Sequence, residues 1–292
     1  MSGGIGLSAV ISVHNEERQL ADCLGTLGFA DEIVVLLDKC TDGSRDIALK
    51  FTDRVEEGAW AIEGERRNAG IDACRGDWIF EIDADERVSP ELAREILATV
   101  ARTTADWHEI PVDNYIGGRL VRHGWGAYNG AASAPRLFSK GDKVWGPERV
   151  HPSLKTGPKF GSLKHGLIHL VDRNISDMID RMNRYTDLMA RDAVDKGTVP
   201  GLGAALRRTV SRGWKSYIAR KGYKEGYYGI ALAFFLLGAA EVAYFSGFVL
   251  WFQDYPRAHA EPAVLLIAGA LFVSATVCGA LALGSFFRTR ES

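Results

Sequence analysis

The 292-residue sequence lacks the features of several familiar protein classes. Its four cysteines include no pair at C-x-x-C spacing, and its seven histidines form no zinc-like pattern with them. The net charge of -2 excludes a bulk polycation of the kind that binds nucleic acid. No basic segment precedes the first apolar run, so we interpret that run as a strand and not as a signal peptide. We therefore expect a reduced, cytosolic setting for this part of the chain.

Common nucleotide, calcium and nucleophile motifs are also missing. Gly4 and Gly6 stand before the first apolar run instead of after it, so they do not form a dinucleotide fingerprint. The stretch that begins at Asp38 resembles a calcium loop, but its twelfth position is Leu49, where a glutamate is required. No P-loop sequence occurs, and no serine or cysteine occupies a nucleophile elbow.

Short apolar runs alternate with helical patterns over the first hundred residues. The predicted strands are residues 7–13, 33–37, a weak strand around Val55, and residues 78–82. This alternation indicates a parallel α/β sheet, in which ligands bind at the carboxyl ends of the strands. Polar residues follow three of the four runs, so we expect them to converge on one edge of the sheet.

Four acidic residues stand within six positions at the end of the last of these runs, from Glu81 to Glu86. Such a cluster is tolerated only when it is solvated or when a cation lies among the carboxylates. Asp83-Ala84-Asp85 therefore predicts a site for Mg²⁺ or Mn²⁺ and a diphosphate. The alternative is a charged turn before the helix that begins near Ser89-Pro90.

The pattern changes after residue 102. Short strands and loops rich in Gly, Trp and Tyr follow, and we expect them to form the acceptor side of a cleft. Residues 175–196 are predicted to form a polar helix with methionines along one face. We interpret that face as a packing surface, with a lipid-contacting or lid helix as the alternative.

The last third of the chain predicts attachment to a membrane. Seven Arg or Lys residues and no acid occur from Gly203 to Lys224. Residues 206–218 have an amphipathic pattern with Trp and Tyr on the apolar side, which favours an interfacial helix on an anionic leaflet over a packing helix. Apolar segments at 229–252 and 263–287 are long enough to cross the bilayer, and the basic residues place both ends in the cytoplasm. An interfacial or re-entrant first segment is the alternative.

Four motifs occur in a fixed order in the α/β part: Ser12 to Glu17, Asp38 to Ser44, Glu65 to Gly70, and Asp83 to Glu86. This set resembles the family 2 glycosyltransferases of the GT-A fold, over about residues 7–190. It is most similar to the bacterial lipopolysaccharide core glucosyltransferase branch, which also has counterparts of Pro135-Arg136-Leu137-Phe138 and Val150-His151. The resemblance implies an α/β class fold, with a Rossmann-like mixed sheet and helices on both faces.

We expect three parts, namely a GT-A catalytic domain over residues 1–200, a basic amphipathic region over 201–228, and a membrane domain over 229–292. The resemblance also implies roles for individual residues. Nucleotide-sugar binding falls to Val13, Asn15, Glu16, Asp38, Arg66, Asn68, Asp83 and Arg136, and metal binding falls to Asp83 and Asp85.

The general base is the open assignment. Enzymes of the most similar branch have His-Glu where this chain has His151-Pro152. Glu148 is therefore the first candidate and His151 the second. As alternatives, Glu148 forms an ion pair with a neighbouring arginine, and His151 is a packed loop residue.

Together these observations predict a metal-dependent, inverting glycosyltransferase that moves a sugar from a UDP-sugar to a lipid-linked saccharide in lipopolysaccharide or exopolysaccharide synthesis. The alternative acceptor is a polyprenyl phosphate, which needs no deprotonated hydroxyl. We expect membrane lipids but not nucleic acid as partners, and leave a homo-oligomer open. The predicted location is the bacterial inner membrane, with the catalytic domain cytoplasmic. A sugar nucleotidyltransferase is disfavoured because no Gly-rich basic loop follows the first strand, and a non-catalytic scaffold would not need Asp38, Asp83 and Asp85 together.

Overall fold

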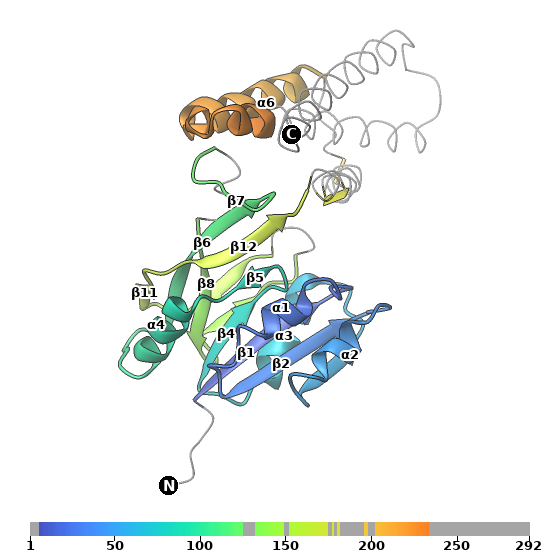
Figure 1. The fold of residues 1–292 in the computed structure, drawn as a ribbon, viewed down its shortest axis with the longest axis vertical. Helices are drawn as coiled ribbons and strands as arrows, with labels where there is room; N and C mark the ends of the chain where they lie inside the picture. The colour runs from blue at the N-terminus through green and yellow to red at the C-terminus, as the bar shows by residue number, and fades with distance from the viewer. Residues whose placement is uncertain are drawn as a thin grey trace, which may run out of the picture. The chain divides into compact units, whose positions relative to one another are not determined.

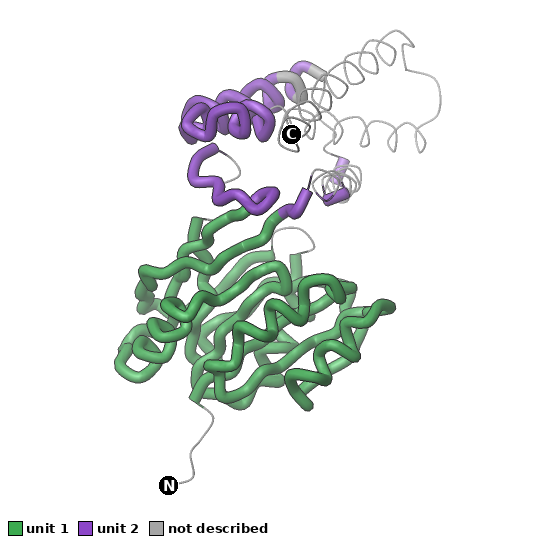
Figure 2. Tube along the Cα trace, viewed as in Figure 1, with its two compact units in different colours: residues 1–115, 130–171 green, residues 116–129, 172–292 purple. Residues whose placement is uncertain are grey.

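The computed structural model describes residues 6–124, 132–148, 152–174, 177, 180–181, 196–197 and 202–233. The chain divides into two compact units (Figure 2). Unit 1 comprises residues 1–115 and 130–171, and unit 2 comprises residues 116–129 and 172–292. Unit 1 lies within the predicted catalytic domain, whose limit at residue 200 stays a prediction.

The core of unit 1 is a parallel sheet in the order β3-β2-β1-β4. Its strands are β1 (Leu7–Val13), β2 (Glu32–Asp38), β3 (Val55–Gly58) and β4 (Trp78–Ile82). All four match the runs predicted from the sequence. β1 lies in the centre, with Val10 opposite Val34 on one side and Glu81 on the other. Its apolar, partly β-branched residues suit a strand covered on both faces.

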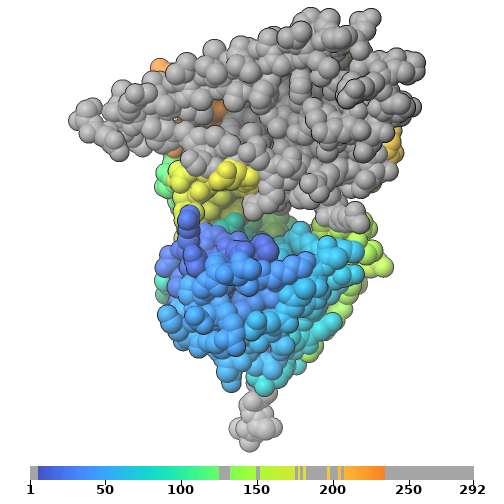
Figure 3. All heavy atoms as spheres, turned by 90° about the vertical axis from the view of Figure 1, so that its right-hand side faces the viewer, coloured from blue at the N-terminus to red at the C-terminus, as the bar shows by residue number. Residues whose placement is uncertain are grey.

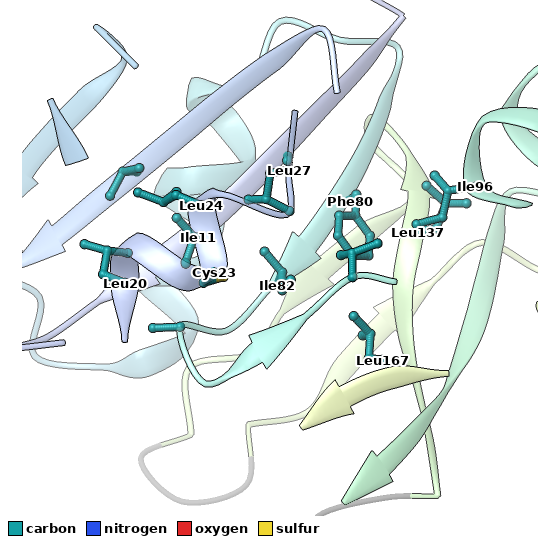
Figure 4. Close-up of a cluster of buried hydrophobic side chains, with 14 of the residues drawn as sticks. Ile11, Leu20, Cys23, Leu24, Leu27, Phe80, Ile82, Ile96, Leu137 and Leu167 are labelled. Atoms are coloured by element: carbon teal, nitrogen blue, oxygen red, sulfur yellow. The ribbon is translucent and has the colours of Figure 1, made fainter. Parts of the chain in front are cut away.

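Helices cover both faces of this sheet, as the resemblance implies (Figure 1). On one face lie α1 (Leu20–Leu24), α2 (Ser44–Ala48) and α4 (Pro90–Val100), and on the other lies α3 (Glu63–Ala73). Leu20 and Leu24 of α1 face Ile11 and Ile82 of the sheet, and all four side chains are almost fully buried (Figure 4). Alternate residues of each strand therefore contribute to separate cores.

Antiparallel strands extend the sheet beyond β4, so it is mixed. β8 (Ser133–Ser139) pairs with β4, and β6 (Trp107–Ile116) pairs with β8. The order then continues to β12 (Leu167–Asp172) and β5 (Glu86–Arg87), while β11 (Phe160–Ser162) pairs with β6. β9 (Lys143–Trp145) and β10 (Leu154–Thr156) form a separate two-stranded sheet. In the space-filling view, blue to cyan residues from the first hundred form a continuous surface of unit 1 (Figure 3).

Unit 2 contains the short strand β7 (Arg119–Leu120), α6 (Leu202–Trp214), a π-helical turn (Lys215–Ala219) and a 3₁₀ turn (Gly222–Glu225). The helix predicted over 206–218 is thus confirmed, although its last turn is π-helical. Buried Glu225 accepts hydrogen bonds from the backbone N–H groups of Arg122 and His123 and forms an ion pair with Arg119. These contacts tie the β7 segment to the 3₁₀ turn.

The predicted membrane segments fall largely outside the described residues. In the stretches of the chain that the structure describes, no helix combines the length and apolarity needed to cross a bilayer. Residues 234–292, which include most of the expected hairpin, lie outside those stretches, as does most of the helix expected at 175–196.

One glycine controls how closely α3 approaches β9. A Cβ atom on Gly64 of α3 would collide with the carbonyl oxygen of Gly146, so a larger residue forces the backbone apart. We expect Gly64→Ala to lower the free energy of unfolding by about 1–3 kcal/mol, measured by urea denaturation, because overpacking outweighs the helix propensity that alanine gains. Gly28→Ala is the control, since a Cβ there meets nothing within 4 Å. Equal stability of the two variants would contradict the prediction.

Candidate active site

Three predicted polar clusters meet at one edge of the parallel sheet. β1 ends at Val13, β2 ends at Asp38 and β4 ends at Ile82, and these strands are neighbours in the order β2-β1-β4. His14 and Asp83 directly follow β1 and β4, and Asp38 is the last residue of β2. The convergence expected from the α/β pattern is therefore observed.

The loops after β1 and β2 are bonded to each other. Asn15 lies in the left-handed region, with φ of 57°, and its Oδ1 accepts the N–H of Thr41 at 2.8 Å. Asparagine tolerates this conformation better than most residues do. The Glu16 N–H donates to Ser44 Oγ at 2.9 Å, and His14 Nδ1 lies 2.6 Å from the Asp38 carbonyl oxygen. Asn15 and Glu16 therefore brace the two loops, and their predicted contacts with a nucleotide stay predictions.

Val13 contributes to the core and not to an open pocket. Its side chain is fully buried beside Ile11 and Leu37. The predicted contact of Val13 with a nucleotide stays a prediction.

Asp38 and Arg66 form a polar pair at the end of β2. Asp38 Oδ1 accepts the N–H of Trp60 at 3.1 Å, and Oδ2 lies 3.3 Å from Arg66 Nη1. Each carboxylate oxygen has a second lone pair, so Asp38 retains capacity to accept further donors. Arg66 Nε is buried and has no hydrogen-bond partner in the described part of the chain. The pair thus combines an anion and a cation that both retain bonding capacity.

Asn68 is bonded to the backbone of β9. Its Nδ2 donates to the carbonyl oxygen of Trp145, and its Oδ1 accepts the Trp145 N–H, both at 2.9 Å. Both ends of the amide are thus bonded to the β9 backbone. Asn68 therefore anchors β9 to α3, and a contact with sugar phosphates stays a prediction.

Asp83 lies between two arginines. Its Oδ1 is 3.1 Å from Arg67 Nη2, and its Oδ2 is 2.5 Å from Arg136 Nη2. Although burial would raise the pKa of Asp83, the guanidinium groups of Arg136 and Arg67 hold it well below the usual range. Arg136 also contacts Glu86 Oε1 at 2.7 Å. The predicted phosphate ligand Arg136 is thus paired with acidic residues in this structure.

Glu81 lies beneath this cluster and is almost fully buried. Its carboxylate oxygens lie 2.5 Å from Arg67 Nη1 and 2.5 Å from Lys143 Nζ. Burial opposes ionisation, but Lys143 and Arg67 lower the pKa of Glu81 to about 2. The sequence motif predicts a role for Arg66 and none for Arg67. Neighbouring residues of a helix point about 100° apart, which sends Arg66 to the end of β2 and Arg67 to the end of β4.

Asp85 has a different partner from Asp83. Its Oδ2 lies 3.2 Å from His169 Nε2, and His169 Nδ1 lies 2.7 Å from Asn114 Oδ1. Burial would lower the pKa of His169, but the hydrogen bond with Asp85 and the nearby acids raise it. His169 belongs to β12, 84 positions after Asp85, and no sequence motif singled it out. Only the fold brings the two together.

Asp85 and His169 fit a divalent ion better than Asp83 does. Among the described residues, no three His, Cys, Asp or Glu side chains converge as a metal site. Magnesium sites for phosphate substrates need only one or two protein ligands, because substrate oxygens and waters complete the shell. Both oxygens of Asp83 already face guanidinium groups. Asp85 Oδ2 and His169 Nε2 face each other, and release of the imidazole proton would leave one oxygen and one nitrogen for an ion. A bound ion would thus be held by Asp85 and His169.

Of the two candidates for the general base, the structure describes Glu148 but not His151. Glu148 is exposed, and its carboxylate accepts the Ser153 N–H at 2.8 Å and the Ser153 hydroxyl at 3.0 Å. The backbone hydrogen bond from Ser153 lowers the pKa of Glu148, which makes it a weak proton acceptor. His151 lies outside the described residues.

A mixed sheet with acidic and basic groups at the carboxyl ends of its parallel strands is the arrangement of a GT-A-like transferase domain. The model of the family Glycosyl transferase family 2 matches residues 8–148. The chain therefore carries a family 2 glycosyltransferase domain, which confirms the resemblance predicted from the ordered motifs. This match ends before the expected membrane segments.

Two curated proteins illustrate the similarity. The lipopolysaccharide core biosynthesis glycosyltransferase LpsC of Rhizobium meliloti (strain 1021) is 26% identical over 208 residues, which cover 66% of this chain and 74% of LpsC. An uncharacterized glycosyltransferase of Rickettsia bellii (strain RML369-C) is 23% identical over 240 residues, which cover 76% of this chain and 79% of that protein.

Solved structures were compared as well. TarS 1–349 of S. aureus in complex with UDP has 13% identity and a TM-score of 0.45, and covers 88% of this chain and 94% of its own. Glucosyl-3-phosphoglycerate synthase of Mycobacterium tuberculosis in complex with Mg²⁺ and UDP has 23% identity and a TM-score of 0.33. The matched part covers 40% of this chain and 46% of the synthase chain.

The ionised state of Glu81 makes stability depend on pH in acid. Its pKa is lowered from 4.5 to about 2 on folding, so the unfolded chain takes up a proton first as the pH falls through this window. Between about pH 5 and pH 2, the wild type should lose about 3 kcal/mol of unfolding free energy relative to Glu81→Gln, whose amide does not titrate. Urea denaturation of both proteins over a pH series measures this difference. Parallel pH curves would contradict the lowered pKa.

Proposed function

We propose that this protein transfers a sugar from a UDP-sugar to a lipid-linked saccharide, with inversion at the anomeric carbon. The observation that carries the proposal is the pairing of two sites at one sheet edge of a family 2 glycosyltransferase domain. Asp38 ends β2 and pairs with Arg66 of α3, and Asp85, which follows β4, pairs with His169 of β12. Such neighbouring sites suit the two ends of a nucleoside diphosphate, namely the base and the diphosphate.

The donor base would contact Asp38 and Arg66. The carboxylate of Asp38 can accept the ring N–H of uracil, and Arg66 has a buried Nε with no partner among the described residues. A buried polar group without a partner costs free energy, which a bound nucleotide would recover. Arg67 and Arg136 both contact Asp83 in the acidic turn after β4, and they supply positive charge for phosphate oxygens.

A divalent ion, Mg²⁺ or Mn²⁺, would be held by Asp85 and His169 together with donor oxygens. Such an ion supplies Lewis-acid stabilisation of the charge that develops on the leaving diphosphate. The chain's own residues would orient the donor through Asp38 and Asp85. A single in-line displacement by an acceptor hydroxyl then inverts the anomeric centre.

The envelope setting is supported by the name of one relative. LpsC is named as a glycosyltransferase of lipopolysaccharide core biosynthesis, and the similarity covers 66% of this chain and 74% of LpsC. A lipid-linked acceptor and a membrane-attached enzyme share a surface, which raises the local concentration of each for the other. We therefore place the reaction in cell-envelope glycan synthesis at the cytoplasmic face of the inner membrane.

The donor is tested by a screen of nucleotide sugars. Full-length protein in detergent is incubated with UDP-, GDP- and dTDP-sugars and Mn²⁺, and release of the nucleotide is measured. We expect release from a UDP-sugar that EDTA abolishes, and we expect Asp38→Asn to raise the KM for that donor by about 10–100-fold, the size expected for a charged hydrogen bond. Asp72→Asn, an exposed residue of α3, is the control. Turnover of GDP-sugars alone would contradict the UDP assignment.

A phosphate acceptor is the second candidate, and the environment of Glu148 favours it. The hydrogen bonds from Ser153 lower the basicity of Glu148, and a polyprenyl phosphate needs no base because it is already ionised. Glu148→Gln should abolish transfer to a saccharide hydroxyl if Glu148 is the base. Full activity of that variant would contradict Glu148 as the base and would favour the phosphate acceptor.

The described part of unit 2 supports contact with an anionic lipid surface. Val210 and Trp214 of α6 are 67% and 64% exposed, and Ile218 in the π-helical turn is 41% exposed. Arg207, Arg208 and the other basic residues from Gly203 to Lys224 stand in the same segment without an acid. Exposed apolar and aromatic groups beside basic residues are typical of interfacial helices.

The depth of Trp214 tests this contact. Full-length protein is reconstituted into vesicles that contain phosphatidylglycerol and lipids brominated at different depths, and its tryptophan fluorescence is compared with that of Trp214→Phe. We expect the Trp214 contribution to be quenched most strongly by bromines near the headgroups, because indole rings prefer the interface. A Trp214 contribution that no brominated lipid quenches would contradict an interfacial α6.

A further inference from the structure

The turn of residues 83–86 is fixed by its own hydrogen bonds and by two arginines. The Asp83 N–H donates to Glu86 Oε2 at 2.9 Å, and the Glu86 N–H donates to the Asp83 carbonyl oxygen at 3.0 Å. Arg136 contacts both carboxylates, and Arg67 contacts Asp83. Asp85 lies inside this closed turn, so its direction toward His169 depends on how Asp83 and Glu86 are held.

Arg67 is the most constrained member of this group. Its Nε, Nη1 and Nη2 each lie beside a different carboxylate, those of Glu63 at 2.9 Å, Glu81 at 2.5 Å and Asp83 at 3.1 Å. Its Cζ lies 5.0 Å from the centre of the Trp145 ring. A guanidinium group is a rigid planar fork, so fixing two nitrogens and one face determines where the third nitrogen points.

The carboxylates of Glu63 and Glu81 direct Arg67 toward Asp83, and of these two only Glu81 is buried. The side chain of Glu81 is 5% exposed, whereas that of Glu63 is 42% exposed and can exchange its contact for water. Lys143 Nζ and Trp145 Nε1 approach the second oxygen of Glu81 at 2.5 Å and 3.3 Å. Glu81 is thereby held from both sides, and it in turn holds Nη1 of Arg67.

We propose that Glu81 is a positioning residue for the divalent-ion and diphosphate site: it fixes Arg67, Arg67 fixes Asp83, and the turn so held presents Asp85. This inference rests on the proposed function, because it assigns the metal to Asp85. Glu81 does not touch donor or metal itself. It acts through Arg67 and Asp83, as residues behind metal ligands commonly do.

Calorimetric titration of the full-length protein with UDP and Mn²⁺ tests the proposal. We expect Glu81→Gln to weaken Mn²⁺-dependent UDP binding by about 10–100-fold, the range found when a group that orients a metal ligand is lost. Glu32→Gln is the matched control. Glu32 is 6% exposed and bonds Arg75 Nε at 2.6 Å, but it begins β2 at the end of the strand opposite Asp38.

A merely structural role for Glu81 would affect stability alone. Both variants are expected to lower the thermal unfolding temperature, since each removes a buried carboxylate that is paired with basic side chains. Only Glu81→Gln should also change the Kd for UDP with Mn²⁺. Wild-type affinity in folded Glu81→Gln overturns the proposal, and so does an equal loss of affinity in Glu32→Gln.

A second variant keeps the test decisive if Glu81→Gln does not fold. The double variant Glu81→Gln and Lys143→Met removes the lysine charge that the single variant leaves buried without a carboxylate. The double variant still lacks the anchor of Arg67, so the same weakened binding is expected, and wild-type affinity overturns the proposal. Absence of Mn²⁺-dependent UDP binding in the wild type would instead contradict the proposed function.

Discussion

The burial of Glu81 at the end of the central sheet is the constraint on which the site depends. A carboxylate in such a position must be paired with cations, and it is paired with Arg67 from α3 and Lys143 from β9. That requirement joins three elements that are distant in sequence. It also determines where Arg67 can point, and therefore how the acidic turn after β4 is held. The need to pair a buried carboxylate with cations therefore determines the geometry of the proposed binding site.

The acidic turn divides into two parts with different chemistry. Asp83 is neutralised by Arg67 and Arg136, whereas Asp85 pairs only with His169 among the contacts described above. The two aspartates of one short motif therefore have different surroundings, and we propose that Asp83 holds the turn while Asp85 offers an oxygen to a cation. The sequence expectation of Asp83 as a metal ligand stays a prediction, and the geometry favours Asp85 with His169.

Local sequence was sufficient to predict the parallel strands and the edge at which polar groups meet. Short apolar runs such as residues 7–13 by themselves indicate a buried strand and where it ends. It was also sufficient for Asp38, whose position at a strand end follows from the same pattern. His169 and Lys143 could not be found in this way, because their roles exist only after β12 and β9 have folded against the site. Arg67 was missed by one position, since a helix turns neighbouring side chains toward different strands. The roles of Val13 and Asn68 at the nucleotide rest on the resemblance alone and stay predictions; in the structure Val13 is buried in the core and Asn68 is bonded to the backbone of Trp145.

The central claim, a metal-dependent UDP-sugar transferase whose metal lies at Asp85, is tested most directly by electron paramagnetic resonance of Mn²⁺. Full-length wild type, Asp85→Asn and the exposed control Asp22→Asn are titrated with Mn²⁺ in the presence and absence of UDP. We expect wild type and Asp22→Asn to bind about one Mn²⁺ per chain only when UDP is present, because donor oxygens complete the coordination shell. We expect Asp85→Asn to lose this binding. Undiminished UDP-dependent Mn²⁺ binding by Asp85→Asn would contradict the assignment of the metal to Asp85.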